Sequence, residues 1–147
     1  METFVIEQDL EFQAPVKKVF DALTKDINKW WDSEHSIGGE KTKKFVCEPK
    51  LGGKFYEIWG EGEGSVWGTV TEVKKNVRLE ICGTMGAMGA TWCKMGYDLE
   101  PNGKSTRVKF THHGMGTFDE DVASNYREGW TSLFGMLKEY VEKSKKK

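Results

Sequence analysis

Residues 4–12 alternate between hydrophobic and polar positions, a period of two that predicts a strand with one buried face. The inward positions are Phe4, Ile6, Leu10 and Phe12, while the acids Glu7, Asp9 and Glu11 take the other face. After Pro15 the apolar spacing changes to three and four residues, which predicts a short helix ending near Leu23. A second short helical segment is expected from Lys25 to Trp31, and the glycines that follow soon after should end it.

Further extended segments are expected between these helices and the last quarter of the chain, each bounded by turn-forming residues. They cover about 42–48, 54–60, 65–73, 77–83, 90–100 and 105–115. Asn102-Gly103 between two alternating segments is a strong hairpin signal, so the last two strands should pair directly. Their shared inner face would carry Cys93, Met95, Tyr97 and Leu99 and, on the partner strand, Val108, Phe110 and His112.

A long amphipathic helix is predicted from about Glu120 to Lys143, with Thr117 or Asp119 as its N-cap. Its apolar stripe consists of Val122, Tyr126, Trp130, Leu133, Leu137, Tyr140 and Val141. Two glycines interrupt this helix, each at a cost of about 1 kcal/mol relative to alanine. We therefore expect close packing or helix curvature to use the missing side chains of Gly129 and Gly135.

The element order predicts an α+β fold in a single domain that spans residues 1–147. Short connections make the strands antiparallel, and a twisted sheet of about seven strands must curl. A long helix in the concave side of such a sheet leaves room for a cavity. The fold therefore predicts a ligand cavity between the sheet and the C-terminal helix.

Composition excludes several classes of protein. The 22 basic and 23 acidic residues give a net charge of −1, which argues against nucleic-acid binding, and the basic segment Lys143–Lys147 is expected to be a solvated end. Three cysteines without C-x-x-C spacing argue against a disulfide framework or a zinc site and favour reduced thiols in a cytoplasm. No apolar leader or membrane-length apolar segment occurs, so we expect a soluble, cytoplasmic protein without a membrane span.

Candidate polar groups for chemistry are few. Neighbours on a strand point to opposite faces, so His112 and His113 cannot easily share a metal, and neither a metal nor a cofactor is expected. His112 should face inward, as a hydrogen-bond partner of a ligand or as a satisfied core residue, and His35 should be solvated in a loop. Glu57 lies either among inward aromatic residues, where burial would raise its pKa, or in water, and the exposed orientation is favoured.

Short motifs in a consistent order extend over nearly the whole chain. They are Phe12-Gln13-Ala14-Pro15, Val19–Thr24, Trp30-Trp31, Gly52–Glu57, Trp67–Val70, Arg78-Leu79 and Gly129-Trp130. Together they resemble START-like, Bet v 1-like (SRPBCC) helix-grip domains, and more narrowly the branch homologous to the C-terminal domain of the activator of Hsp90 ATPase. One departure is the turn at residues 74–77, where many members carry a proline.

The resemblance implies a helix-grip fold with a cavity, and across the superfamily the binding of lipids, sterols, polyketides or hydrophobic hormones. Our favoured hypothesis is that the cavity binds a small hydrophobic or amphipathic molecule without converting it. The expected ligand-binding residues are Trp30, Trp31, Met85, Met88, Cys93, Met95, Tyr97, Phe110, His112, Trp130, Leu133, Phe134 and Leu137. The segment Gly83–Gly89, with its two methionines, is either an adaptable entrance flap or an ordinary hairpin loop.

Two alternatives remain open. The narrower resemblance implies an interaction module for an Hsp90-type chaperone, although a single domain of 147 residues leaves no room for the separate N-terminal module of the eukaryotic activator. A cyclase or hydrolase could use Glu57, Tyr97 or His112 as acid and base, while Cys93 is expected to be a core residue because nothing near it in sequence would activate a thiol. A monomer or a weak homodimer is expected.

Overall fold

The computed structural model describes residues 1–87 and 89–143, so the expected site residue Met88 and most of the basic C-terminal segment lie outside the described residues. Its elements are β1 (Glu2–Phe12), α1 (Val16–Leu23), the 3-10 turns η1 (Ile27–Lys29), η2 (Ser33–His35) and η3 (Gly39–Lys41), β2 (Lys44–Cys47), β3 (Lys54–Gly60), β4 (Glu63–Lys74), β5 (Arg78–Gly83), β6 (Thr91–Asn102), β7 (Ser105–Gly116) and α2 (Val122–Lys143). The predicted element order is confirmed.

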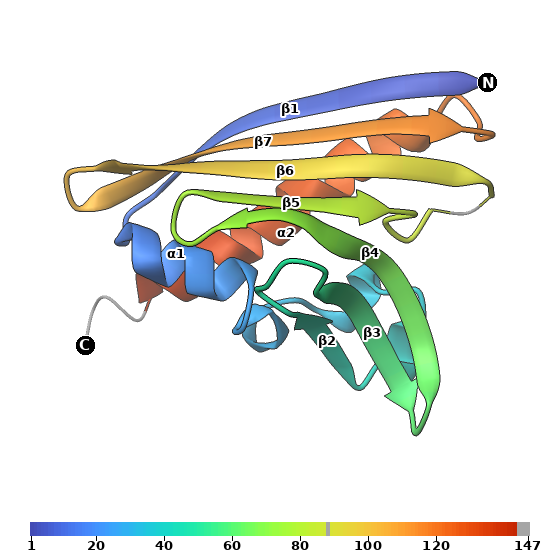
Figure 1. The fold of residues 1–147 in the computed structure, drawn as a ribbon, viewed down its shortest axis with the longest axis horizontal. Helices are drawn as coiled ribbons and strands as arrows, with labels where there is room; N and C mark the ends of the chain where they lie inside the picture. Colours follow the sequence, from blue (N-terminus) through green and yellow to red (C-terminus); the bar gives the residue numbers. More distant parts are fainter. Residues whose placement is uncertain (88, 144–147) are drawn as a thin grey trace.

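The seven strands form a single antiparallel sheet in the order β1-β7-β6-β5-β4-β3-β2. β1 pairs with β7 along its whole length, from Glu2 opposite Gly116 to Phe12 opposite Thr106. Figure 1 shows β2 and β3 bending away from the long strands, while α2 crosses behind the sheet. The curved α+β helix-grip architecture predicted from the sequence is confirmed.

The inner face of the sheet follows the predicted alternation. Cys93, Met95, Tyr97 and Leu99 of β6, and Val108, Phe110 and His112 of β7, are all buried. The side of α2 that meets them buries Trp130, Leu133, Phe134, Leu137 and Val141. Ring centroids of Phe110 and Trp130 lie 5.0 Å apart, so α2 packs its aromatic residues directly on the strands.

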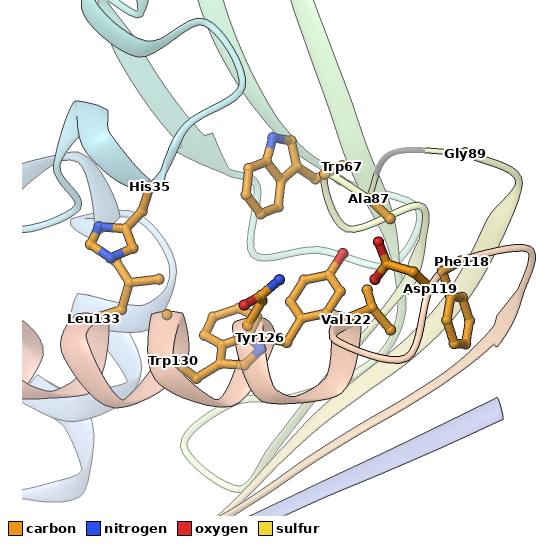
Figure 2. Close-up of a pocket in the computed structure, with 13 residues that line it drawn as sticks. His35, Trp67, Ala87, Gly89, Phe118, Asp119, Val122, Tyr126, Trp130 and Leu133 are labelled. Atoms are coloured by element: carbon orange, nitrogen blue, oxygen red, sulfur yellow. The ribbon is translucent and has the colours of Figure 1, made fainter. Parts of the chain in front are cut away.

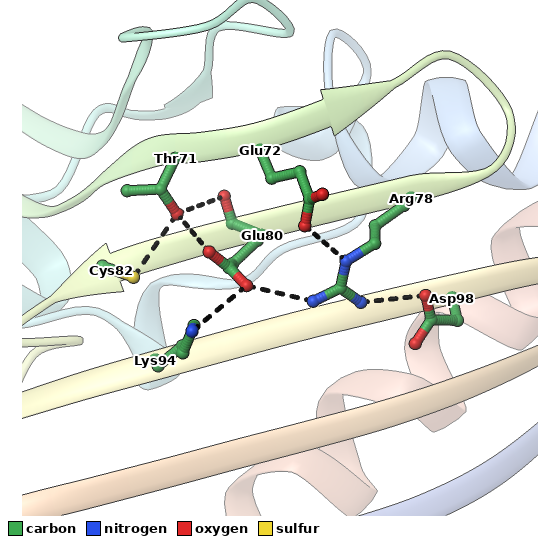
Figure 3. Close-up of polar contacts among 7 residues, drawn as sticks. All are labelled: Thr71, Glu72, Arg78, Glu80, Cys82, Lys94 and Asp98. Atoms are coloured by element: carbon green, nitrogen blue, oxygen red, sulfur yellow. Dashed lines mark hydrogen bonds and ion pairs between the residues drawn. The ribbon is translucent and has the colours of Figure 1, made fainter.

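Opposite charges face each other across the outer side of the sheet. Asp9 pairs in register with Lys109, which in turn lies opposite Asp98. Figure 3 shows Arg78 among three carboxylates of this side, donating to Glu72 at 2.8 Å, Asp98 at 2.9 Å and Glu80 at 3.0 Å. One guanidinium therefore connects β4, β5 and β6, and its bonds to these carboxylates outweigh burial and raise its pKa.

The predicted turns form where the sequence placed them. Gly103 has a φ of 65° between β6 and β7, as the Asn-Gly hairpin signal requires. The turn that lacks the family's proline has Asn76 at a φ of 64°, a left-handed conformation that asparagine adopts more readily than most residues. This departure from the family pattern is thus accommodated within an ordinary hairpin.

Two expectations about helices need correction. The segment expected to be helical from Lys25 to Trp31 forms only the single 3-10 turn η1, and its tryptophan Trp30 is fixed instead by donating from Nε1 to the Ala22 carbonyl at 2.7 Å. Gly135 is exposed, and a Cβ built there would meet nothing within 4 Å, so close packing does not explain this glycine. At Gly129 the nearest atom is His35 Cδ2 at 3.9 Å, which leaves space beside the helix.

Candidate ligand-binding site

A pocket of about 560 Å³ lies between the N-terminal half of α2, the loop after β5 and the segment that contains η2. Its described lining residues are His35, Trp67, Gly86, Ala87, Gly89, Phe118, Asp119, Val122, Asn125, Tyr126, Gly129, Trp130 and Leu133. Figure 2 shows Trp67 facing the helix residues Tyr126 and Trp130 across the pocket, with His35 at one end and Asp119 at the other.

The Trp67 wall belongs to an aromatic cluster at the β2–β4 end of the sheet. The Trp67 ring makes edge contacts with Trp31 at 5.6 Å, Phe45 at 5.2 Å and Phe55 at 6.0 Å between centroids. Trp67 is only 7% exposed, and its Nε1 donates to Glu57 Oε2 at 2.7 Å. The indole is therefore held on two sides and offers its carbon surface to the pocket.

Glu57 is fully buried, so the favoured exposed orientation was wrong. Its two carboxylate oxygens accept hydrogen bonds from Ile37 N at 2.8 Å, Gly38 N at 2.6 Å, Thr42 Oγ1 at 3.0 Å, Trp59 Nε1 at 2.6 Å and Trp67 Nε1 at 2.7 Å. Burial acts to raise the pKa of this carboxyl, but bonds from two indole and two backbone N–H groups outweigh it and lower the pKa.

The Glu57 carboxylate ties the segment around η3 to the sheet. A Cβ built on Gly38 would lie 2.3 Å from Trp59 Nε1, so only glycine lets this backbone approach the indole and the carboxylate together. Because Glu57 is ionised and saturated with donors, it is poorly suited to act as a general acid. Its consequence for the pocket is indirect: it fixes Trp67 and the segment that follows His35.

The two aromatic residues on the helix side are anchored in the same way. Trp130 Nε1 donates to His112 Nδ1 at 2.9 Å, and the Tyr126 hydroxyl donates to the Met85 carbonyl at 2.9 Å. Met85 is buried and has a φ of 51°, so the loop after β5 is bound to α2 through a strained position. The N–H and O–H groups of the pocket's aromatic walls are thus already satisfied within the protein.

His112 faces inward and is fully buried, as expected. Since Nδ1 accepts from Trp130, the ring hydrogen of the neutral imidazole is on Nε2, which has no hydrogen-bond partner. Burial, and secondarily the neighbouring His113, lowers its pKa to about 3, so His112 is neutral at pH 7. It supports Trp130 from behind and does not line the pocket.

Polar groups gather at the two ends of the pocket. His35, expected to be solvated, is partly buried, and its Nδ1 lies 2.5 Å from Asp32 Oδ1. At the other end, Asp119 Oδ1 accepts from the Asp121 backbone N–H at 3.2 Å, before the first turn of α2. The Asn125 amide, in the first turn of α2, also lines the pocket.

The residues predicted to bind a ligand fall into two groups. Trp130 and Leu133 line the pocket. The other described ones lie in the buried core around it: Trp30, Trp31, Met85, Cys93, Met95, Tyr97, Phe110, His112, Phe134 and Leu137. Whether any of them contacts a ligand stays a prediction.

Several lining residues were not among those predicted. Trp67 stood in a recognised motif and Tyr126 on the apolar stripe of the helix, so a signal for both was present in the sequence. Phe118 had no such signal and Asp119 was expected only as an N-cap of the helix, because their place at the pocket depends on how the connection between β7 and α2 folds back. His35 reaches the pocket at the end of the 3-10 turn η2, in a segment that was expected to be a solvated loop.

The cysteines and the possible metal ligands were further candidates for chemistry. Cys47, Cys82 and Cys93 are free thiols, and burial raises the pKa of Cys93 to about 12. Across residues 1–87 and 89–143, no group of three or more His, Cys, Asp or Glu side chains is arranged to hold a metal ion. In the same ranges, no helix has the length and hydrophobicity needed to cross a membrane.

Solved structures share this fold. The Aha1 dimer from Colwellia psychrerythraea matches with a TM-score of 0.68 and 21% identity, over 95% of this chain and 96% of that one. Mll3558 from Rhizobium loti matches with a TM-score of 0.70 and 17% identity, over 92% of this chain and 95% of that one. CalU16 from Micromonospora echinospora matches with a TM-score of 0.64 and 20% identity, over 95% of this chain and 73% of that one. At such identities the likeness is one of fold.

No curated protein sequence matches the chain significantly. The family model described as "Activator of Hsp90 ATPase homolog 1-like protein" matches residues 13–142, which is most of the chain. Its agreement with the observed fold also supports the wider START-like, Bet v 1-like relationship. The chain therefore belongs to the family of proteins like the activator of Hsp90 ATPase homolog 1.

Proposed function

We propose that the pocket beside α2 binds a small hydrophobic or amphipathic molecule. The observation that carries this proposal is a cavity of about 560 Å³ whose aromatic walls have their own polar atoms satisfied within the protein. Small-molecule sites typically occupy about 300–1,000 Å³ and are lined mainly by apolar and aromatic groups with a few polar ones. The polar ends formed by His35 and Asp119 would orient an amphipathic ligand.

Glycines keep this space open. Gly86, Gly89 and Gly129 all border the pocket and contribute no side chain to fill it. Gly86 and Gly89 also have φ values of 73° and 85°, so larger residues would be strained there. At these three positions a ligand therefore meets no side chain that it would have to displace.

Binding without conversion is favoured over catalysis. Glu57, Tyr97 and His112, the candidate acids and bases, are buried and do not line the pocket. A general acid or base must come within hydrogen-bond reach of the reacting group. In this geometry Trp67 and Trp130 stand between the pocket and two of those candidates, Glu57 and His112.

Filling the pocket tests the proposal. Gly129→Leu is expected to weaken binding of the neutral fluorescent probe Nile red at least about 100-fold, because the new side chain occupies the space beside His35. Leucine is also a better helix former than glycine, so the variant should remain folded. The readout is a fluorescence titration of the full chain.

Gly135→Leu is the matched control, since Gly135 lies on the same helix but is exposed and has no neighbour within 4 Å. This variant should bind Nile red as the unchanged chain does. Equal affinity in Gly129→Leu and Gly135→Leu would show that the probe binds elsewhere and would refute the site.

A second candidate function is docking on an Hsp90-type chaperone, as the family name suggests. The specific observation that favours it is an apolar patch on the outer face of the sheet. Trp92 and Met115 face each other in register and are 54% and 46% exposed, with Val5 49% exposed on the neighbouring strand. Such a patch suits a protein partner and is separate from the pocket.

If this second function holds, Trp92→Gln should reduce stimulation of a purified Hsp90 ATPase at least about tenfold, because central aromatic residues dominate interface energies. Leu51→Gln is the control, since Leu51 is 73% exposed in the turn between β2 and β3. No stimulation by the unchanged chain, or an equal loss in both variants, would argue against this role.

A further inference from the structure

We propose that the pocket beside α2 selects small organic cations, whose positive head would lie at the Asp119 end between the aromatic walls. This inference rests on the proposed function and adds the charge of the ligand to it. Four observations carry it: the charges of the lining, the aromatic surfaces, the surroundings of Asp119 and the balance at the start of α2.

The charged groups of the lining are unbalanced. Asp119 is a carboxylate, and none of the described lining residues is lysine or arginine. The remaining titratable base, His35, is already bonded through Nδ1 to Asp32 Oδ1. Any positive charge on the imidazole would therefore be compensated by Asp32, and the pocket as a whole favours a positive ligand over a negative one.

The aromatic walls add a second attraction for a cation. Trp67, Tyr126 and Trp130 line the pocket, while their N–H and O–H groups bond to Glu57, the Met85 carbonyl and His112. With these donors engaged elsewhere, the three aromatic residues have no N–H or O–H left to offer an anion, and the Asn125 amide and the His35 ring are the remaining side-chain donors of the described lining. Their electron-rich ring faces attract ammonium groups, most strongly where water is excluded.

Asp119 is placed to meet such a head group. Figure 2 shows its carboxylate between Ala87 and Val122 at one end of the pocket, close to Phe118. Asp119 is exposed, so its carboxylate is open to the head group of a ligand. The arrangement combines one carboxylate with several aromatic side chains, which is the composition of sites that bind quaternary ammonium groups.

The N-terminus of α2 would by itself attract an anion, because a helix N-terminus carries about half a positive charge. Here the carboxylate of Asp119, which lines the pocket, lies shortly before α2 begins at Val122. The charge of this carboxylate exceeds the half charge of the helix terminus, so the net potential at this end of the pocket is negative. A fatty-acid carboxylate at the same place would be repelled.

The test compares three probes that differ in charge and share a benzyl group: benzyltrimethylammonium, its neutral isostere neopentylbenzene and the anion phenylmethanesulfonate. Each is titrated into the full chain at 0.15 M salt, and the indole N–H signals of Trp67 and Trp130 are followed by NMR. The cation is expected to bind at least about tenfold more tightly than the neutral isostere, which corresponds to about 1.4 kcal/mol. The anion should bind most weakly.

Two variants with the same change in net charge separate Asp119 from the general surface charge. Asp119→Asn keeps an oxygen that can accept from Asp121 N–H. It is expected to lower the affinity for the cation about five- to tenfold and to change the affinity for the neutral isostere by less than about twofold. Glu120→Gln is the control, because Glu120 is exposed and does not line the pocket. It should change the affinity for the cation by less than about twofold.

The outcomes distinguish this inference from the function on which it rests. If neopentylbenzene binds as tightly as the cation, the inference on charge is overturned and the apolar pocket stands. If none of the three probes binds, the inference on charge and the proposed binding function are both overturned. An equal loss of cation affinity in Asp119→Asn and Glu120→Gln would also overturn the inference, because the attraction would then be a property of the acidic surface rather than of the pocket.

Discussion

Glu57→Gln is expected to lower the free energy of unfolding by about 3 kcal/mol. Five donors converge on the two oxygens of the buried Glu57 carboxylate, and glutamine would place an amide N–H₂ against some of them. Donors left without an acceptor in a buried site cost about 1–3 kcal/mol each, and more where the lost partner is charged. The measurement is the urea midpoint of the full chain at pH 7.

The same carboxylate gives a pH dependence with a defined sign. The pKa of Glu57 is lower in the folded chain than its ordinary value of 4.5, so the folded state holds this proton less tightly than the unfolded state. The contribution of ionised Glu57 to the free energy of unfolding is therefore complete above about pH 4.5. It is lost as the pH falls through the lower pKa that Glu57 has in the folded chain. Glu57→Gln should remove this part of the acid sensitivity.

Glu61→Gln is the control for both measurements, because Glu61 is an exposed residue at the tip between β3 and β4. It should change the unfolding free energy by no more than about 0.5 kcal/mol. The experiment also separates structure from catalysis. A catalytic Glu57 would lose turnover on substitution while the midpoint stayed unchanged, and an unchanged midpoint would contradict the structural role assigned here.

A second large effect is expected on the free energy of unfolding. It should fall by about 2 kcal/mol as the pH falls from 7 to 5, because His112 is buried in its neutral form. The pKa of His112 falls from its ordinary 6.5 to about 3 in the folded chain. The unfolded chain therefore takes up a proton below pH 6.5 that the folded chain does not, and stability declines as the pH falls toward 3. Glu57 contributes little to the change between pH 7 and pH 5, because its pKa is lowered from the ordinary value of 4.5 in the folded chain.

His112→Gln should reduce this slope, since glutamine has no titratable group and its carbonyl oxygen can still accept from Trp130 Nε1. His113→Gln is the matched control, because His113 follows on the same strand but is exposed on the other face. The quantity to compare is the change in unfolding free energy with pH, measured by urea titration. The same slope in both variants and the unchanged chain would contradict a neutral, buried His112.

Most of the fold could be predicted because its signals are local. The alternation of Cys93 to Leu99, the three-and-four spacing of α2 and the Asn102-Gly103 turn each depend on residues close together in the chain. Each of these features is found in the structure. Local signals also placed Trp130 and Leu133 on the face of α2 that meets the pocket.

The orientation of Glu57 could not be settled in this way. Alternation along β3 allows either face, and the deciding groups are the backbone of Ile37 and Gly38 and the indole of Trp67, which lie ten to twenty residues away. A register shift between Phe55 and Tyr56 in the pairing of β3 with β4 further weakens the simple pattern. Burial of this carboxylate is therefore a tertiary effect.

The position of the pocket escaped prediction for a related reason. The inward residues of β6 and β7 were expected to border the cavity, but Tyr97, Phe110 and Phe134 pack on one another and fill that region. Space remains instead where glycines and connecting loops meet the first turns of α2. Periodicity identifies which residues face inward, while the fit between their side chains decides where a cavity is left.

The most direct test of the proposed binding function is native mass spectrometry of the protein isolated from the cells that produce it, beside Gly129→Leu and Gly135→Leu. We expect a discrete small-molecule mass on the unchanged chain and on Gly135→Leu, which leaves on denaturation and is absent from Gly129→Leu. A bound mass retained by Gly129→Leu, or no bound mass on any of the three together with no probe binding, would contradict a ligand site in this pocket.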